Sequence, residues 1–444
     1  MTTNASAEVG WQHARLASIG AALVAVTAAG PTLHLALGGW ALMLIFAIGG
    51  AGALLASQVN DADQRGALIV ILVSAVAMRL ALLFVEPYLS TDIYRYVWDG
   101  RVQAEGINPY RYVPSAPELA YLRDANIFPN INRADYAVTI YPPVGQAIFL
   151  AVTRLGESVL VMKLGLIAFE AGMVAALLAL LSRQGRPATR IAAYAWHPLP
   201  VWEIAGSGHV DAAMCVLLMV GLLLFVKGRT LLAGVVVTLG ALVKPTALLA
   251  LPVFWRPWNW RLPLVVGLTV LFAYLPYLSV GRGVFGFLWG YVEEEGLASG
   301  RGINALWIME RFTGPIPRAG EIYAAVATAF LLALAIVVAL RRIRSDETAI
   351  TSLRWLLVSF LILASPHYPW YFLVLVPFLV LGQSTTAWVL TLACPLLYDS
   401  VPGGWWPEHD VRIALFILAT IVALAYDAWS LRRKPRSITL GESA

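Results

Sequence analysis

The stretch ALIVILVSAVAMRLALLFVEPYLSTDIYRY, residues 67–96, contains the transition that decides the fold of this chain. Its first 19 residues are apolar except for Ser74 and Arg79, and that length suits a helix that crosses ~30 Å of hydrocarbon. Polar and aromatic residues begin at Glu86 and continue to Tyr141, and we call residues 86–141 the polar island. Because ionisable groups beside a membrane helix are costly to keep there, the island is where we expect function.

The rest of the chain has the composition of membrane helices. Of its 444 residues, 59% are hydrophobic and 13% are charged, against ~25% charged in soluble domains. Candidate helices cover residues 16–37, 40–57, 67–85, 143–155, 159–181, 191–204, 212–226, 231–248, 262–280, 305–312, 323–340, 352–364, 370–381, 386–397 and 413–429. We predict one all-α, polytopic membrane domain over residues 1–444, with about 11–14 membrane helices that include half or re-entrant helices.

Basic residues gather in five clusters that predict the topology of these helices. The clusters are Arg183/Arg186/Arg190, Lys227/Arg229, Arg256/Arg261, Arg341/Arg342/Arg344 and Arg432/Arg433/Lys434/Arg436. The positive-inside rule places all five in the cytoplasm, together with the basic tail 431–444. Residues 205–211, 281–304, 365–370 and 400–410 and the polar island then lie outside. The number of membrane crossings agrees with these sides only if residues 143–155 enter and leave the membrane on the same side.

Within the island, the segment Asp92-Ile-Tyr-Arg-Tyr-Val-Trp-Asp99 has helical spacing. Its two carboxylates are seven residues apart, which puts them on one side of a helix, two turns and ~10.5 Å apart. That separation is too large for two groups that share a proton. The alternative is a surface helix in the membrane interface, with tyrosine and tryptophan as an aromatic belt.

Four segments of the island resemble the first large extracytoplasmic loop of the GT-C glycosyltransferases. They are Thr91-Asp92-Ile-Tyr-Arg-Tyr96, Asp99-Gly100-Arg101, Gly106-Ile-Asn-Pro-Tyr110 and Thr139-Ile-Tyr-Pro-Pro143. The chain is most similar to the mannosyltransferase-like branch, which includes the GPI mannosyltransferase I catalytic subunit and bacterial polyprenol-phosphomannose-dependent enzymes. Many of these relatives carry paired acidic residues where this chain has Thr91-Asp92.

The resemblance implies a membrane enzyme that takes a hexose, with mannose the best guess, from a polyprenyl-phosphate donor. The acceptor would be a glycan or glycolipid, the active site extracytoplasmic and the location a bacterial inner membrane. The acidic residue that acts as catalytic base in this superfamily maps onto Asp92. A carboxylate suits the task because an acceptor hydroxyl becomes a good nucleophile only when its proton is taken. We also expect the island's other motif residues to bind substrate: Tyr94, Arg95, Asp99, Arg101, Asn108, Tyr110 and Tyr141.

The lipid phosphate that leaves in such a reaction needs fixed cations. Arg79, Lys244 and Arg301 are the candidates, with Arg95 and Arg101 in reserve. Arg79 has the alternative of snorkelling to the interface. Lys244 precedes Pro245, which interrupts an apolar helix and frees backbone carbonyls beside the amine.

Two further motifs have both a functional and a structural interpretation. In Gly206-Ser-Gly-His209-Val-Asp211, either His209 or Asp211 binds donor phosphate or acceptor hydroxyls, or Asp211 merely caps the next helix. In Ser365-Pro-His367-Tyr-Pro-Trp-Tyr371, the aromatic rings and His367 either stack on a sugar or belong to the aromatic belt.

Several function classes lack support in the sequence. There is no Walker sequence, glycine-rich phosphate loop or H-E-x-x-H motif, and Cys215 and Cys394 lie in apolar runs without a zinc spacing. We therefore predict no metal or other cofactor. The net charge of +5 sits at helix ends, so it predicts no nucleic-acid partner. A transporter or flippase of lipid-linked or polar solutes is the alternative function, but the two similar halves typical of transporters are missing.

Overall fold

The computed structural model describes residues 2–59, 63–257, 259–297, 299–341, 343–398 and 406–433. Within these ranges every regular element is a helix, which confirms the predicted all-α class. Part of the predicted outer loop 400–410 lies outside the described residues, as do Arg342, Lys434, Arg436 and the rest of the basic tail beyond residue 433.

Eight helical segments in the described part of the chain are long and apolar enough to cross a membrane. They comprise α1 (Thr2–Leu37), α2 (Gly39–Ser57), α3 (Gln64–Leu83), α6 (Val159–Arg183), α12 (Arg261–Tyr274) with its continuation to Glu294, α15 (Ala319–Leu340), α16 (Asp346–Ala364) and α19 (His409–Arg433). Shorter apolar segments lie between them: α5 (Pro143–Thr153), α9 (Asp211–Val226), α10 (Thr230–Ala241), Pro245–Phe254, Pro369–Leu381 and Thr385–Leu397. This mixture confirms the polytopic architecture with half-length helices.

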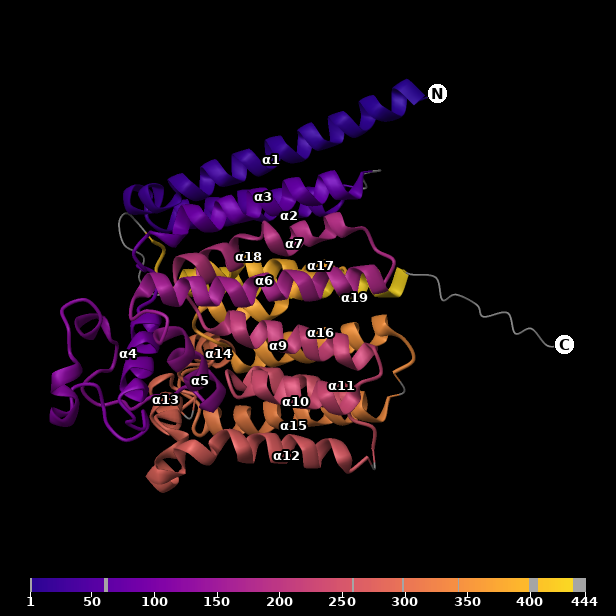
Figure 1. Cartoon of the computed structure of the whole chain (residues 1–444). Helices are drawn as coiled ribbons and strands as arrows, with labels where there is room; N and C mark the ends of the chain where they lie inside the picture. Colours follow the sequence, from indigo (N-terminus) through magenta and orange to yellow (C-terminus); the bar gives the residue numbers. More distant parts are fainter. Residues whose placement is uncertain are drawn as a thin grey trace.

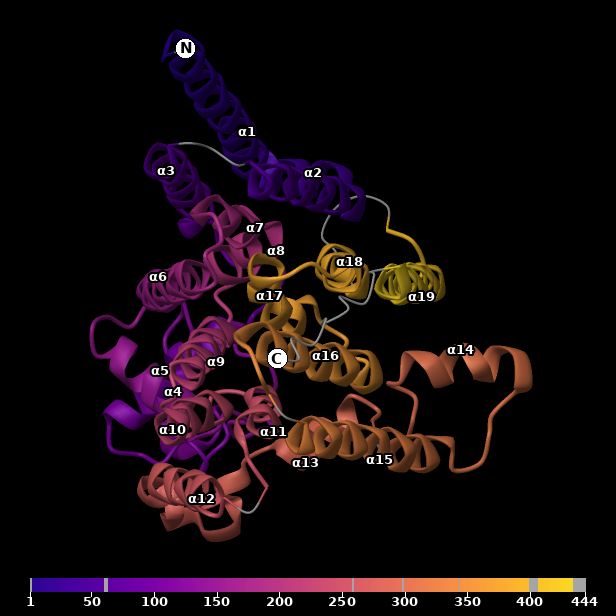
Figure 2. The same ribbon diagram turned by 90° about the vertical axis from the view of Figure 1, so that its right-hand side faces the viewer.

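The long helices run side by side in one bundle (Figure 1). The N-terminal end of α1 and the C-terminal end of α19 lie at one end of the bundle, whereas α4 (Asp92–Ala104) and α13 (Leu288–Glu294) lie at the opposite end. We call this second end the island end. Figure 2 shows most of the bundle helices nearly end-on, while α14 (Asn304–Thr313) lies across the bundle axis.

The expected helix over residues 191–204 is wrong, because proline divides it. The chain forms η3 (Ala188–Ile191), α7 (Ala192–Ala195), α8 (Pro198–Pro200) and the π-helical turn η4 (Val201–Gly206). Pro198 and Pro200 have no backbone N–H, and their rings clash with the preceding turn.

The expected helix over residues 231–248 is also wrong at its end. Helix α10 stops at Ala241, and after Pro245 the chain continues as η5 (Pro245–Ala250) and α11 (Leu251–Phe254). Lys244 is extended, with φ −144° and ψ 132°, because the proline ring excludes the helical conformation of the residue before it. The break therefore leaves Lys244 at the island end of α10 and outside any helix.

Three more expected helices are tighter than an α-helix over part of their length. The segment 262–280 leaves α12 at Tyr274 and continues as the 3₁₀ segment η6 (Leu275–Phe285). The segment 370–381 begins as η7 (Pro369–Leu375) and becomes α17 (Val376–Leu381), and the segment 386–397 runs as α18 (Thr385–Ala393) and then η8 (Cys394–Leu397).

Residues of three basic clusters make contacts at the end of the bundle opposite the island (Figure 1). Arg183 Nε lies 2.6 Å from Asp346 Oδ2 at the start of α16. Arg186 donates to the Leu381 carbonyl at 2.6 Å, and Arg256 donates to the Ile343 carbonyl at 3.4 Å. These clusters share one end, as the predicted topology requires.

Helix α5 begins and ends at the island end. At its start, Val144 N donates to the Leu242 carbonyl at 3.0 Å. Beyond its last turn, Arg154 donates to the Ala104 carbonyl of α4 at 2.8 Å. This geometry supports the prediction that residues 143–155 enter and leave on one side.

A cysteine-accessibility map tests this topology. In a variant without Cys215 and Cys394, both of which are buried, we expect Glu105→Cys and Leu155→Cys to be labelled from the same side of the membrane. Ser182→Cys, near the end of α6, is expected to be labelled from the other side. Labelling of Leu155→Cys and Ser182→Cys from one side would contradict the re-entrant path of α5.

Candidate active site

A cavity of about 430 Å³ lies at the island end, between the polar island and the bundle. Five segments line it: the island, the connection from α10 to η5, the end of α12, the chain from η6 into α13, and the start of η7. Its polar and aromatic lining consists of Ser90, Thr91, Asp92, Arg95, Tyr110, Asn132, Arg133, Tyr141, Lys244, Thr246, Tyr274, Phe285, Phe287, Tyr291, Tyr368, Trp370 and Tyr371.

Asp92 is the first residue of α4 and lines the cavity. Asn132 Nδ2 donates to Asp92 Oδ1 at 2.9 Å, and the Tyr141 hydroxyl donates to Asp92 Oδ2 at 3.2 Å. No Lys or Arg in the described part of the chain lies within ion-pair distance of this carboxylate. A position at a helix N-terminus favours the negative charge, and two neutral donors orient it without neutralising it.

Tyr141 is held in place by packing as well as by this hydrogen bond. Its ring meets Tyr96 edge-on at 5.0 Å and Phe149 edge-on at 5.3 Å, and its own carbonyl accepts from Tyr110 at 2.6 Å. Burial, and then the charge of Asp92, raise the pKa of the Tyr141 hydroxyl. The hydroxyl therefore keeps its proton and remains a donor to Asp92.

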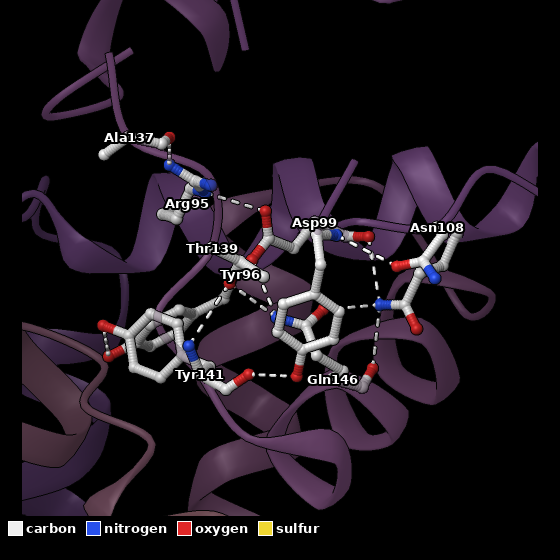
Figure 3. Close-up of polar contacts among 10 residues, drawn as sticks. Arg95, Tyr96, Asp99, Asn108, Ala137, Thr139, Tyr141 and Gln146 are labelled. Carbon is white, nitrogen blue, oxygen red and sulfur yellow. Dashed lines mark hydrogen bonds and ion pairs between the residues drawn. The ribbon is translucent and has the colours of Figure 1, made fainter. Parts of the chain in front are cut away.

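A buried ion pair within α4 contacts the returning chain (Figure 3). Arg95 Nε lies 2.7 Å from Asp99 Oδ1, and Arg95 Nη1 donates to the Ala137 carbonyl at 3.1 Å. Gln146 Nε2, from α5, donates to Asp99 Oδ2 at 2.9 Å and to Thr139 Oγ1 at 2.7 Å. Asp99 is 1% exposed and does not reach the cavity, whereas Arg95 lines it.

Lys244 is the cation that the α10 break presents to the cavity. Its Nζ lies 2.7 Å from Asp211 Oδ2 and 4.7 Å from the centre of the Tyr371 ring. Asp211 begins α9 and is 1% exposed, so it supports Lys244 from behind. An ammonium group has three donors, and this arrangement leaves donor capacity for a ligand.

Several cavity-lining residues were not predicted from the sequence, among them Asn132 and Arg133. Arg133 has a left-handed backbone with φ 56°. Its Nε lies 2.6 Å from Glu294 Oε2, and its Nη2 lies 3.9 Å from Glu295 Oε1. Both residues belong to an irregular loop, where no helical or strand period indicates which side chains point inward.

The aromatic motif at the start of η7 forms one wall of the cavity. Tyr368, Trp370 and Tyr371 line it, and the Tyr368 and Trp370 rings stack at 4.5 Å. His209 stacks on Trp370 at 4.1 Å and lies 3.3 Å from Glu203. His209 is fully buried, so it supports the wall instead of facing a ligand.

The structure brings five of the predicted site residues to the cavity: Asp92, Arg95, Tyr110, Tyr141 and Lys244. Asp211 contacts one of them. The remaining eight are not among the lining residues: Arg79, Tyr94, Asp99, Arg101, Asn108, His209, Arg301 and His367.

Most of these eight have structural partners instead. Tyr94 donates to Glu86 at 3.1 Å, and Asn108 donates to the Tyr277 carbonyl at 2.9 Å. The other contacts are Arg101 with Asp124 and Glu157, and His367 with Glu295 at 2.6 Å. Arg301 is exposed on the loop between α13 and α14.

Arg79 is the clearest correction. Its guanidinium pairs with Glu170 of α6 at 2.6 Å and also donates to the Ala195 carbonyl. It is 7% exposed, so it neither snorkels to the interface nor reaches the cavity. A buried charge needs a partner, and here that partner lies on another helix.

Comparison with known proteins identifies the family. Residues 1–260 match the model of the family described as alpha-(1->6)-mannopyranosyltransferase, N-terminal domain. The chain is also similar to alpha-(1->6)-mannopyranosyltransferase A of Mycobacterium tuberculosis, with 22% identity over 384 residues that cover 81% of this chain and 70% of the relative. No solved structure matches the chain.

The family match confirms the resemblance seen in the island motifs and favours an enzyme over a transporter. Because the matched domain covers more than half of the 444 residues, this protein belongs to the alpha-(1->6)-mannopyranosyltransferase family and is a membrane glycosyltransferase.

Proposed function

We propose that the protein transfers mannose from a polyprenyl-phosphate donor to a hydroxyl of an extracytoplasmic glycan or glycolipid, with inversion and with Asp92 as general base. The observation that carries the proposal is the position of Asp92, an unpaired carboxylate in the cavity lining. The family match supports the transfer of mannose.

Asp92 has the environment that a general base needs. The hydrogen bonds from Asn132 and Tyr141 fix both carboxylate oxygens but add no positive charge. A cationic partner would lower the basicity of the carboxylate. As the acceptor hydroxyl attacks the anomeric carbon, Asp92 takes its proton, and the bond from that carbon to the phosphate oxygen breaks.

Lys244 is the cation best placed for the leaving phosphate. It is held against Asp211 and the Tyr371 ring, so it does not have to reorganise as negative charge develops. Arg133 lines the same cavity but lies near two carboxylates, Glu294 at 2.6 Å and Glu295 at 3.9 Å.

The lipid part of the donor requires an apolar route, and the wall formed by η6 and α13 supplies it. Val284, Phe285 and Leu288 line the cavity. From the same segments, Leu275 and Leu278 are each 48% exposed. Apolar surface thus continues from the cavity to the outside of the bundle, where we place the prenyl chain.

The stereochemistry of the donor follows from inversion. If the linkage formed is alpha-(1->6), as in the names of the family and of the M. tuberculosis relative, attack from the face opposite the phosphate requires a β-linked mannosyl phosphate. The acceptor group is then the primary hydroxyl at carbon 6 of a hexose.

The reaction is tested with purified protein in liposomes that contain labelled polyprenyl-phosphate mannose and a mannoside acceptor. We expect Asp92→Asn to lower kcat by ~10²–10⁴, the usual contribution of general-base catalysis, while donor binding is retained. Asp135→Asn is the matched control, because Asp135 is an exposed carboxylate of the same island that does not line the cavity. Equal transfer by wild type and Asp92→Asn would contradict the proposal.

The role of Lys244 is tested by removing the whole ion pair. We expect Lys244→Met with Asp211→Asn to lower kcat/KM by ~10²–10³, as for the loss of one oxyanion donor. The double variant avoids an unpaired buried carboxylate, so its thermal unfolding in detergent should stay near that of wild type.

The control is the double variant Arg79→Met with Glu170→Leu, which removes a buried cation that was also a sequence candidate for the phosphate. Its turnover should be retained. If the Lys244 double variant turns over as fast as wild type, stabilisation of the leaving phosphate does not depend on Lys244.

A further inference from the structure

The outer rim of the cavity carries an aromatic ring that the proposed reaction does not use. Tyr136 is 58% exposed and belongs to the same turn as Asn132, the residue that orients Asp92. The turn is tight, because the N–H of Ala137 donates to the Arg133 carbonyl at 3.1 Å.

Other groups on this rim are suited to a sugar. The Tyr136 ring meets Phe287, a cavity-lining residue, edge-on at 5.8 Å. Beside them, Arg133 pairs with Glu294 at 2.6 Å. An aromatic face packs against the apolar C–H face of a pyranose, while a carboxylate and a guanidinium bond its hydroxyls.

The charge of the rim indicates a neutral ligand. Arg133 is balanced by Glu294, and Glu295 lies 2.6 Å from His367. The described part of the rim therefore offers no surplus cation for an anionic glycan. It also lies on the exposed side of the island, because Asp135 and Tyr136 are both exposed.

The spacing indicates which sugar of the acceptor would bind there. Asn132 donates to the Asp92 carboxylate at 2.9 Å, and Tyr136 lies four residues further along the same turn. An acceptor whose terminal sugar meets Asp92 would place its next sugar near Tyr136.

We propose that Tyr136 and Phe287, with Arg133 and Glu294, form an acceptor subsite for the second sugar of an uncharged hexose chain. This inference rests on the proposed function, because it assumes that Asp92 receives the acceptor proton. The enzyme then prefers acceptors of two or more sugars to single sugars.

The test compares a lipid-linked monosaccharide acceptor with the matching alpha-(1->6)-linked disaccharide acceptor, for wild type and Tyr136→Ala. We expect the variant to reduce kcat/KM for the disaccharide about tenfold more than for the monosaccharide, the size of effect that one aromatic contact provides. Tyr136→Phe retains the ring and should retain the preference. Tyr121→Ala, which removes a 67% exposed tyrosine of the island that does not line the cavity, should also retain it.

An equal loss with both acceptors, or an unchanged preference in Tyr136→Ala, would overturn the subsite. This outcome differs from failure of the proposed function, because release of polyprenyl phosphate is followed in the same assay. A wild type that releases none contradicts the reaction itself, whereas an active wild type without a Tyr136 effect contradicts only the subsite.

Discussion

The buried ion pair between Arg95 and Asp99 fixes the polar island, and the rest of the site depends on it. Arg95 also holds the Ala137 carbonyl, and Asp99 receives Gln146 from α5. These contacts hold α4 against the chain that returns toward the membrane. Asn132 and Tyr141 lie on that returning chain, so the same contacts bring them to Asp92.

Charge compensation is the second constraint on this cavity. Each cation that lines its described part is already matched: Arg95 with Asp99, Arg133 with Glu294 and Lys244 with Asp211. Asp92 has only neutral donors. The resting site is therefore not strongly cationic, and the donor phosphate must be recognised by donors that these pairs leave unused. Lys244 fits this description because its partner is buried behind it.

The sequence predicted those parts of the fold and of the site that neighbouring residues indicate, and it did not predict those that depend on contacts between distant residues. The apolar runs predicted the helical membrane fold, and a short motif pointed to Asp92. Pro245 indicated the break that exposes Lys244, although the helix was expected to continue past it. Arg79 was misjudged because its partner, Glu170, is 91 positions away on another helix. Asn132 and Arg133 were missed because an irregular loop has no period, and only the folded chain shows which way its side chains point.

The most direct test of this account is a structure of the Asp92→Asn variant with polyprenyl-phosphate mannose bound. The account predicts a phosphate oxygen within hydrogen-bonding distance of Lys244 Nζ, the anomeric carbon turned toward position 92, and the prenyl chain along Val284 and Leu288. A donor whose phosphate lies away from Lys244, or whose sugar lies outside the cavity, would contradict it.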